Sequence, residues 1–232
     1  TTNGLAYTVN ADETVTTWFT YECPFLVSSA TLMGGWITTG YANYTTDPGG
    51  SAFGGAGGTG WLQVTNGNSG NITARIAGIG ANRYWQPDAG KDIRIKFRLK
   101  LDSLTTDVGN RFGIGISTPT SANIYSVFSS VSDMPARFII DTNTLYAANA
   151  NGTTATTTDI TSGITLTNWN LYEIVYDAGT SIKFYVNGTL KATHTTNLST
   201  ASSGMNITAG NIADTGDTVN AELTPIIISL EL

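Results

Sequence analysis

The stretch 181-SIKFYVNGTLKATHTT-196 decides which fold the rest of the chain is expected to adopt. Two runs of β-type residues flank an Asn-Gly pair, and His194, the only histidine of the chain, lies near the end. Asn-Gly between alternating hydrophobic residues is the strongest short-range signal for a β-hairpin. His194 is in turn a candidate general base. The register of this hairpin therefore bears on fold and function together.

One register follows from a two-residue type I′ turn over the Asn-Gly pair, in which Val186 faces Thr189. Strict alternation from that pair places Lys191 on the apolar face. The same alternation leaves Leu190 on the wet face. Because a lysine would then enter the core, the sequence argues against this register.

The other register has a type I turn over Val186 and Asn187, followed by Gly188 in a G1 bulge. Phe184 then faces Leu190. A slip of one residue moves a whole strand to the opposite face, so the apolar pattern favours the bulged register. Gly188 is required there because only glycine adopts a positive φ readily. The predicted inner face consists of Ile182, Phe184, Leu190, Ala192 and His194.

The same two-residue periodicity recurs along the chain and predicts an all-β fold. Ile93 to Leu101 alternates apolar residues with Arg and Lys, the pattern of a half-buried antiparallel strand. Phe112 to Ile116 repeats it with glycines between, so another backbone or a ligand could approach Gly113 and Gly115 closely. Many short strands separated by turn signals predict an antiparallel two-sheet jelly-roll sandwich.

We expect one such domain over residues 31–232. Residues 1–30 carry β-type runs of their own and predict an N-terminal arm or extra edge strands. The Gly-rich segment 33–60 contains four aromatic residues, which is unusual for a free linker. A long surface loop within the domain is therefore expected, with an interdomain linker as the alternative.

Composition and charge argue against several classes of function. The net charge is −6, the pI is about 4.6, and charged residues make up 12% of the chain. The one basic run, 94–100, alternates with apolar residues, so we expect no nucleic-acid partner. The longest apolar run, Pro225 to Leu230, is too short to span a bilayer, and we expect no membrane insertion. A single cysteine, Cys23, excludes an internal disulfide.

A longer stretch around the hairpin, 167-TNWNLYEIVYDAGTSIKFYVNGTLKATHTTNLST-200, resembles the end of a laminin-G-like or concanavalin A-like module. Its NGTLKATHTTNLST portion is similar to modules of bacteriophage tail-fibre, head-fibre and decoration proteins. The resemblance covers about residues 90–232 and implies a jelly roll of the lectin and glucanase type. It leaves function open, since this fold hosts lectins, adhesion modules, hydrolases and lyases.

No catalytic motif accompanies the resemblance. Glucanases of this fold carry a strand reading Glu-x-Asp-x-x-Glu or Glu-x-Asp-x-Glu, and the five glutamates of this chain form no such run. The Gln-Ile-His strand of the alginate-lyase-like relatives is also absent. We interpret His194, which ends an apolar strand face, as a histidine at the edge of the core. We therefore expect no enzyme, with a polysaccharide hydrolase or lyase carrying an unrecognised site as an alternative.

Aromatic residues in polar loops are the better signal for function. Trp and Tyr rings stack on the C–H faces of sugars while nearby amides bond the hydroxyls, although a protein interface uses the same groups. Plugging the ends of the sandwich is the structural alternative for these rings. The candidate carbohydrate-binding residues are Trp36, Tyr41, Tyr44, Asn82, Tyr84 and Trp85.

Calcium is the one cofactor that the resemblance implies. It needs six or more oxygen ligands, which loops rich in Asp and Asn can supply. The structural alternative is that these aspartates form turns and bind no metal ion. The candidate ligands are Asp88 and Asp92, with Asp214 and Asp217 as a further pair.

The sequence thus predicts a non-enzymatic surface or virion protein, a phage decoration, fibre or attachment module that recognises carbohydrate or the host surface. Its expected location is extracellular, on the virion surface. Its expected partners are a cell-surface glycan or other virion proteins, and a homotrimer is the oligomer that this setting implies. A purely architectural capsid or tail component is the second alternative.

Overall fold

The structure of the chain is a computed structural model. It describes the backbone of residues 5–9, 15–23, 26–28, 31–33, 36–39, 43–46, 62–67, 70–76, 90–103, 111–117, 133–200, 205–213, 218–224 and 226–231. Side chains are described within residues 90–101, 111–117, 134–200, 205, 207, 221–224 and 226–231.

These residues form nineteen strands and no helix. All strand pairs are antiparallel, and they build a ten-stranded sheet, a seven-stranded sheet and one separate two-stranded pair. The predicted fold class, an all-β two-sheet jelly-roll sandwich, is confirmed. Within the described part of the chain, no helix has the length and apolar character needed to cross a bilayer.

The ten-stranded sheet, called the larger sheet below, runs in the order β1-β2-β19-β9-β14-β15-β16, with β18, β7 and β6 following on from β9. Its strands are β1 (Leu5–Val9), β2 (Val15–Cys23), β6 (Asn43–Thr46), β7 (Leu62–Gly67), β9 (Ile93–Ser103), β14 (Asn170–Asp177), β15 (Ser181–Val186), β16 (Thr189–His194), β18 (Thr218–Leu223) and β19 (Ile226–Glu231). β1 and β2 extend it beyond β19. The division of the chain at residue 30 stays a prediction.

The seven-stranded sheet, called the second sheet below, runs in the order β13-β12-β11-β10-β17-β8-β5. Its strands are β5 (Trp36–Thr39), β8 (Gly70–Ile76), β10 (Arg111–Ser117), β11 (Asp133–Asp141), β12 (Thr144–Asn151), β13 (Ala155–Asp159) and β17 (Asn206–Ala213). The separate pair is β3 (Leu26–Ser28) with β4 (Thr31–Met33).

Two strands lie inside the segment 33–60, which was expected to be a surface loop. β5 pairs with β8 of the second sheet, and β6 pairs with β7 of the larger sheet. The loop prediction is therefore wrong for these eight residues, four in each strand. Both strands are rich in threonine and carry an aromatic residue, and β propensity outweighs the glycines around them.

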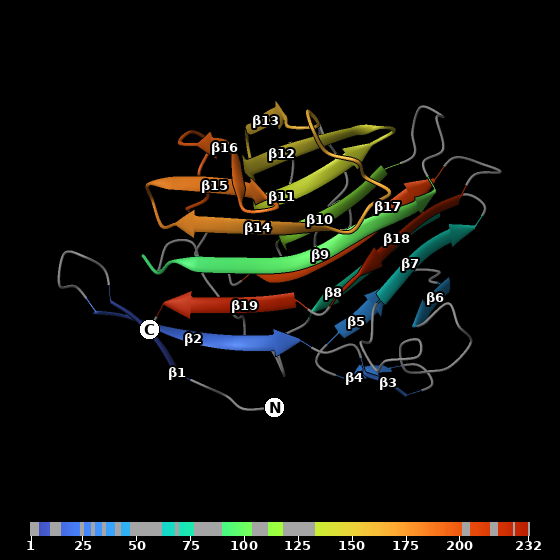
Figure 1. The fold of residues 1–232 in the computed structure, drawn as a ribbon, viewed down its shortest axis with the longest axis horizontal. Coiled ribbons are helices and arrows are strands. Elements are labelled where there is room, and N and C mark those ends of the chain that lie inside the picture. The colour runs from blue at the N-terminus through green and yellow to red at the C-terminus, as the bar shows by residue number, and fades with distance from the viewer. Residues whose placement is uncertain are drawn as a thin grey trace.

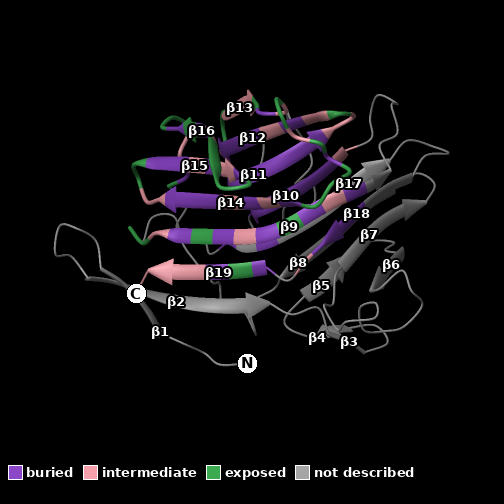
Figure 2. Cartoon of the chain, viewed as in Figure 1, coloured by how far each residue is buried: buried purple, intermediate pink, exposed green. Residues whose placement is uncertain are grey.

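β9 shows how sequence alternation creates the sandwich. Its odd-numbered residues from Ile93 to Leu101 are buried, and its basic residues lie on the opposite, outer face. Figure 2 shows the result as buried segments of β9 alternating with exposed or half-buried ones. The same strand pairs with β14 on one side and with β19 and β18 on the other. The larger sheet is thus assembled around β9.

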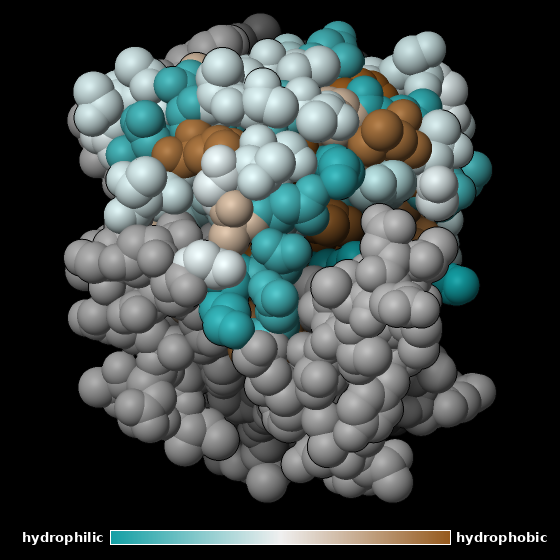
Figure 3. All heavy atoms as spheres, turned by 90° about the vertical axis from the view of Figure 1, so that its left-hand side faces the viewer, coloured by the Kyte–Doolittle hydropathy of each residue, from teal (hydrophilic) through white to brown (hydrophobic). Residues whose placement is uncertain are grey.

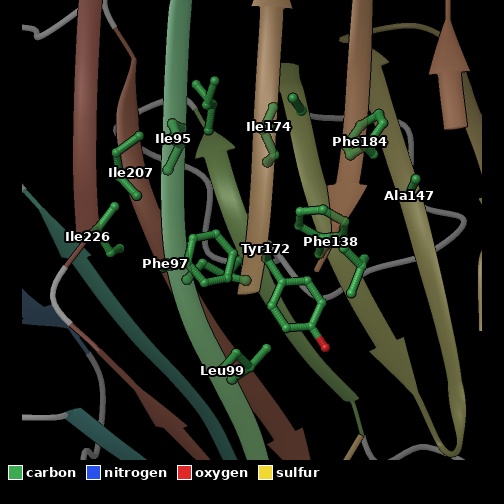
Figure 4. Close-up of a cluster of buried hydrophobic side chains, with 14 of the residues drawn as sticks. Ile95, Phe97, Leu99, Phe138, Ala147, Tyr172, Ile174, Phe184, Ile207 and Ile226 are labelled. Carbon is green, nitrogen blue, oxygen red and sulfur yellow. The ribbon is translucent and has the colours of Figure 1, made fainter. Parts of the chain in front are cut away.

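The core lies between the two sheets, which Figure 1 shows as stacked layers. Phe138 of β11 packs edge-on against Tyr172 of β14, with ring centroids 5.0 Å apart. It packs in the same way against Phe184 of β15 at 5.4 Å. Phe97 of β9 stacks on Tyr172 at 5.6 Å. These rings lie at the centre of the buried cluster in Figure 4 and join the two layers.

The β15–β16 hairpin differs from the predicted register at its turn. Asn187 and Gly188 both have positive φ, 52° and 77°, and Val186 pairs with Thr189, the pattern of a type I′ turn. The positive φ expected at Gly188 is confirmed, but the type I turn with a G1 bulge is wrong. Asparagine tolerates the left-handed conformation, and the type I′ turn matches the right-handed twist of the strands.

The type I′ turn alone would place Lys191 on the inner face of the sheet. A β-bulge further along β16 prevents this. Tyr185 pairs with Leu190, but Phe184 pairs with Ala192, so Lys191 is an extra residue. The strand thereby changes face, and Ala192 and His194 enter the core. Leu190, which was predicted on the inner face, is 50% exposed.

The side chain of Asn187 fastens the hairpin turn to β14. Its Oδ1 accepts a hydrogen bond from the backbone N–H of Leu171 at 2.9 Å, and its Nδ2 donates to Asn170 Oδ1 at 2.9 Å. Its own N–H donates to the carbonyl of Leu171 at 2.7 Å. Asn187 therefore combines a backbone conformation with three hydrogen bonds.

We predict that Asn187→Ala lowers the free energy of unfolding by about 2 kcal/mol, because alanine disfavours positive φ and lacks the amide. Asn187→Gly keeps the conformation and loses only the side-chain bonds, so its loss should be about 1 kcal/mol. Urea denaturation measures both. Equal losses in the two variants would show that the left-handed backbone contributes nothing.

Gly115 of β10 lies where the backbone of β11 comes close. A Cβ at this position would stand 2.2 Å from the carbonyl oxygen of Ala136 and 2.5 Å from Cα of Arg137. The register between β11 and β12 shifts between Met134 and Arg137. The glycine pattern predicted that either a backbone or a ligand could approach closely. At Gly115 it is the backbone of β11 that does so.

We predict that Gly115→Ala lowers the free energy of unfolding by about 1–3 kcal/mol, the range for overpacking a rigid site. Thermal and urea denaturation test this. Thr193→Ala at an exposed strand position is the control and should stay within about 0.5 kcal/mol of the wild type. A Gly115→Ala protein as stable as the control would contradict the close approach.

Candidate functional site

Most of the carbohydrate-binding residues predicted from sequence lie outside the described residues. Trp36 is the first residue of β5 in the second sheet, and Tyr44 lies on β6 in the larger sheet. A joint site for these two stays a prediction. The residues outside the described ranges are Tyr41, Asn82, Tyr84, Trp85, Asp88, Asp214 and Asp217.

Asp92, a predicted calcium ligand, forms a structural junction at one end of the sandwich. Its Oδ1 accepts a hydrogen bond from Ala178 N–H at 2.8 Å, and its own N–H donates to Glu231 Oε2 at 3.0 Å. Partial burial raises the pKa of Asp92, and the charges of Asp177 and Glu231 add to this. Figure 3 looks onto this end, where the described surface is mostly of intermediate hydropathy, with both hydrophilic and hydrophobic groups.

No group of three or more His, Cys, Asp or Glu among the described residues is placed to hold a metal ion. One carboxylate oxygen of Asp92, Oδ1, is already engaged by the backbone N–H of Ala178. Because Asp88 is not described, calcium binding by the two aspartates together stays a prediction.

A chain of polar side chains, here called the edge seam, closes one open side of the sandwich. It consists of Asn149, Thr154, Thr156, Thr158, His194, Thr196 and Asn197. β13 and β16 are the terminal strands of their sheets, and Figure 1 shows them near each other. Asn197 donates to Thr156 Oγ1 at 2.9 Å and accepts from Thr154 Oγ1 at 2.6 Å. The seam joins the two sheets by hydrogen bonds where apolar contact ends.

His194 lies at the inner end of the edge seam and is 4% exposed. The Nδ2 of Asn149 donates to the carbonyls of Thr196 and Asn197 at 2.9 and 2.7 Å. Both amide hydrogens are thereby used, so Asn149 Oδ1 accepts from His194 Nδ1–H at 2.7 Å. The other ring nitrogen, Nε2, then accepts from the Thr158 hydroxyl at 2.9 Å. The hydrogen bonds fix a neutral imidazole.

The interpretation of His194 as a core-edge residue is confirmed. Its ring packs on Phe184 with centroids 5.1 Å apart, and burial lowers its pKa. The order Thr158–His194–Asn149 nevertheless matches that of a nucleophile, a base and an orienting amide. Sequence reasoning missed both partners, because Asn149 and Thr158 lie 45 and 36 residues from His194 in the chain.

We predict that His194 makes stability depend on pH. Its folded-state pKa lies below the ordinary 6.5, so below that pH the unfolded chain binds a proton that the folded chain does not. The stabilisation is fully present above about pH 6.5 and is lost as the pH falls below it, by at most about 1.4 kcal/mol per pH unit.

Urea denaturation between pH 7.5 and 5.5 tests this against His194→Gln, which keeps a neutral polar side chain. The difference in free energy of unfolding between the two proteins should shrink as the pH falls. A constant difference would show that His194 binds its proton equally in both states.

Sequence reasoning also missed an aromatic residue on the outer face of the larger sheet. Trp169, directly before β14, is 37% exposed, and the Lys100 Nζ lies 5.5 Å from the centroid of its ring. Lys100 and Arg98 alternate with buried leucine and phenylalanine on β9. The available signal was the polar context Thr-Asn-Trp-Asn just before an alternating strand.

Comparison with known proteins gives a likeness of fold. No protein-family model and no curated protein sequence matches the chain. Among solved structures, the chain is similar to the carbohydrate recognition domain of Emp46p in its potassium-bound form, with a TM-score of 0.61 and 11% identity. That likeness covers 90% of this chain and 95% of the other.

Two further structures share the architecture. One is the binding domain of botulinum neurotoxin DC, solved in complex with rat synaptotagmin II, with a TM-score of 0.57 and 14% identity. This chain covers less than half of it, 46%, through 89% of its own length. The other is a conserved carbohydrate esterase from the Shiga toxin-encoding bacteriophage phi24B, with a TM-score of 0.55, 15% identity and coverage of 86% and 91%. Identities this low establish the fold alone.

Proposed function

We propose that the chain is a carbohydrate-binding module. The observation that carries this proposal is the likeness to the Emp46p carbohydrate recognition domain, which extends over nearly the full length of both chains. An exposed tryptophan among polar and charged side chains on a rigid sheet is the type of surface that binds sugars.

We further propose that the module is not an enzyme. The edge seam uses Asn149 and His194 to hold two sheets together, and His194 is almost fully buried. A nucleophile other than Thr158 would have to displace the Thr158 hydroxyl from His194 Nε2. The competing function is ester hydrolysis by Thr158, His194 and Asn149, favoured by their hydrogen-bonding order and by the fold of the phage esterase.

The proposed setting is the outside of a cell or virion. The NGTLKATHTTNLST stretch resembles phage fibre and decoration modules, and the esterase with a similar fold comes from a bacteriophage. In this setting the partner is a host-surface glycan or a neighbouring virion protein, and the module acts in attachment. A purely architectural role would leave the protein without a glycan ligand.

A glycan array with the intact chain tests carbohydrate binding. We expect selective binding to a related set of glycans, with competition by the free saccharide. Trp36→Ala and Trp85→Ala test the predicted aromatic residues on the same array. No binding to any glycan would contradict the proposed function and favour the architectural role.

Hydrolysis of p-nitrophenyl acetate and acetylated oligosaccharides tests the competing function. We expect no turnover above the rate of a Thr158→Val variant, which retains the shape of the side chain without its hydroxyl. Turnover that disappears in both Thr158→Val and His194→Gln would establish an esterase and contradict our proposal.

A further inference from the structure

Trp169 is 37% exposed, and hydrogen bonds of its neighbours fix the backbone around it. The N–H of Asn168 donates to the carbonyl of Thr165 at 3.1 Å, and the Nδ2 of Asn170 donates to the carbonyls of Thr165 and Asn168, both at 2.9 Å. The backbone on both sides of the indole is therefore fixed by a buried side chain, since Asn170 is 5% exposed. A pre-ordered aromatic surface loses little conformational entropy when a ligand stacks on it.

Two residues near Trp169 on the outer face of the larger sheet are basic, Lys100 and Arg98, and the Glu222 carboxylate lies beside Lys100. Lys100 lies beside its ring and forms an ion pair of 3.0 Å with the buried carboxylate of Glu222. Arg98 lies two residues before Lys100 on the same face of β9, opposite Leu171 of β14. Two residues along a strand span about 7 Å, so the indole and the guanidinium are within the reach of one small oligosaccharide.

Because the Lys100 ammonium is already paired with the Glu222 carboxylate, the positive charge for an anionic ligand comes from Arg98. Its side chain is exposed, and its guanidinium forms no hydrogen bond or ion pair with the side chains that the structure describes. The main-chain N–H of Arg98 donates to Thr224 Oγ1 at 2.9 Å, and its carbonyl accepts from Thr224 N–H at 3.0 Å. The residue is thus held firmly at its backbone while its positive group faces solvent.

We infer that Trp169, Arg98 and Lys100 form a subsite for a carboxylate-bearing saccharide. This inference rests on the proposed carbohydrate binding and specifies its ligand class. The indole stacks on a C–H face of the sugar ring, and the planar guanidinium of Arg98 binds the carboxylate through two parallel N–H···O bonds. Lys100 positions the ring while its ammonium stays paired with Glu222.

The chain as a whole is acidic, which makes this local arrangement selective. With a net charge of −6 the protein repels anions in general, and binding depends on a short-range contact with Arg98. Affinity for the acidic saccharide should therefore fall as sodium chloride screens that contact.

Titration calorimetry with matched probes tests the subsite in the intact chain. The acidic probes are trigalacturonate and 3′-sialyllactose, and their neutral counterparts are methyl-esterified trigalacturonate and lactose. We expect at least one acidic probe to bind about tenfold or more tightly than its counterpart, as charge-assisted hydrogen bonds require. Arg98→Gln and Trp169→Ala should each weaken that binding about tenfold or more.

Two variants on the same face are matched controls. Arg94→Gln removes another exposed arginine of β9, and Leu190→Ala removes another exposed apolar residue. Both should bind the acidic probe within about twofold of the wild type. Equal unfolding temperatures across the four variants show that each one is folded.

The outcomes separate this inference from the proposed function. Acidic binding that survives both Arg98→Gln and Trp169→Ala overturns the subsite. A protein that binds only neutral glycans on the array also overturns the subsite, but it supports the proposed carbohydrate binding. A protein that binds no glycan at all overturns both.

Discussion

The contact on which the rest of the structure depends is the packing of Phe138 against Tyr172 and Phe184 across the sandwich. Each sheet turns an apolar face toward the other, and neither of these faces can remain in water, so each sheet requires the other. The alternation in β9 and the bulge in β16 both direct side chains toward this layer.

The edge seam shows how the sandwich ends without exposing its core. Apolar contact between the sheets ends at β13 and β16. There, threonine, asparagine and histidine side chains form hydrogen bonds between the two sheets. Buried polar groups are tolerable only when each is satisfied, and here Asn149 uses both amide hydrogens and its oxygen. A geometry that resembles a catalytic triad thus has a complete structural explanation.

Sequence reasoning succeeded where the determinants are local. Alternation in 93–101 gave the central strand, and Asn-Gly gave the hairpin with glycine at positive φ. It failed where two local features compensate each other, because the type I′ turn and the bulge at Lys191 together restore the inward face of Ala192. It also could not find the subsite around Trp169, because only the register between β9 and β14 brings Arg98 near it.

The bulge at Lys191 has a further consequence, because β16 is the last strand of its sheet. An unbroken outer strand offers a template to which another polypeptide can add itself, and this is a common route to aggregation. The extra residue interrupts the regular spacing of backbone donors and acceptors. The Lys191 Nζ also donates to the carbonyl of Ser162 at 2.9 Å. The same irregularity that returns His194 to the interior therefore also makes the outer edge of β16 a poorer template for pairing with another strand.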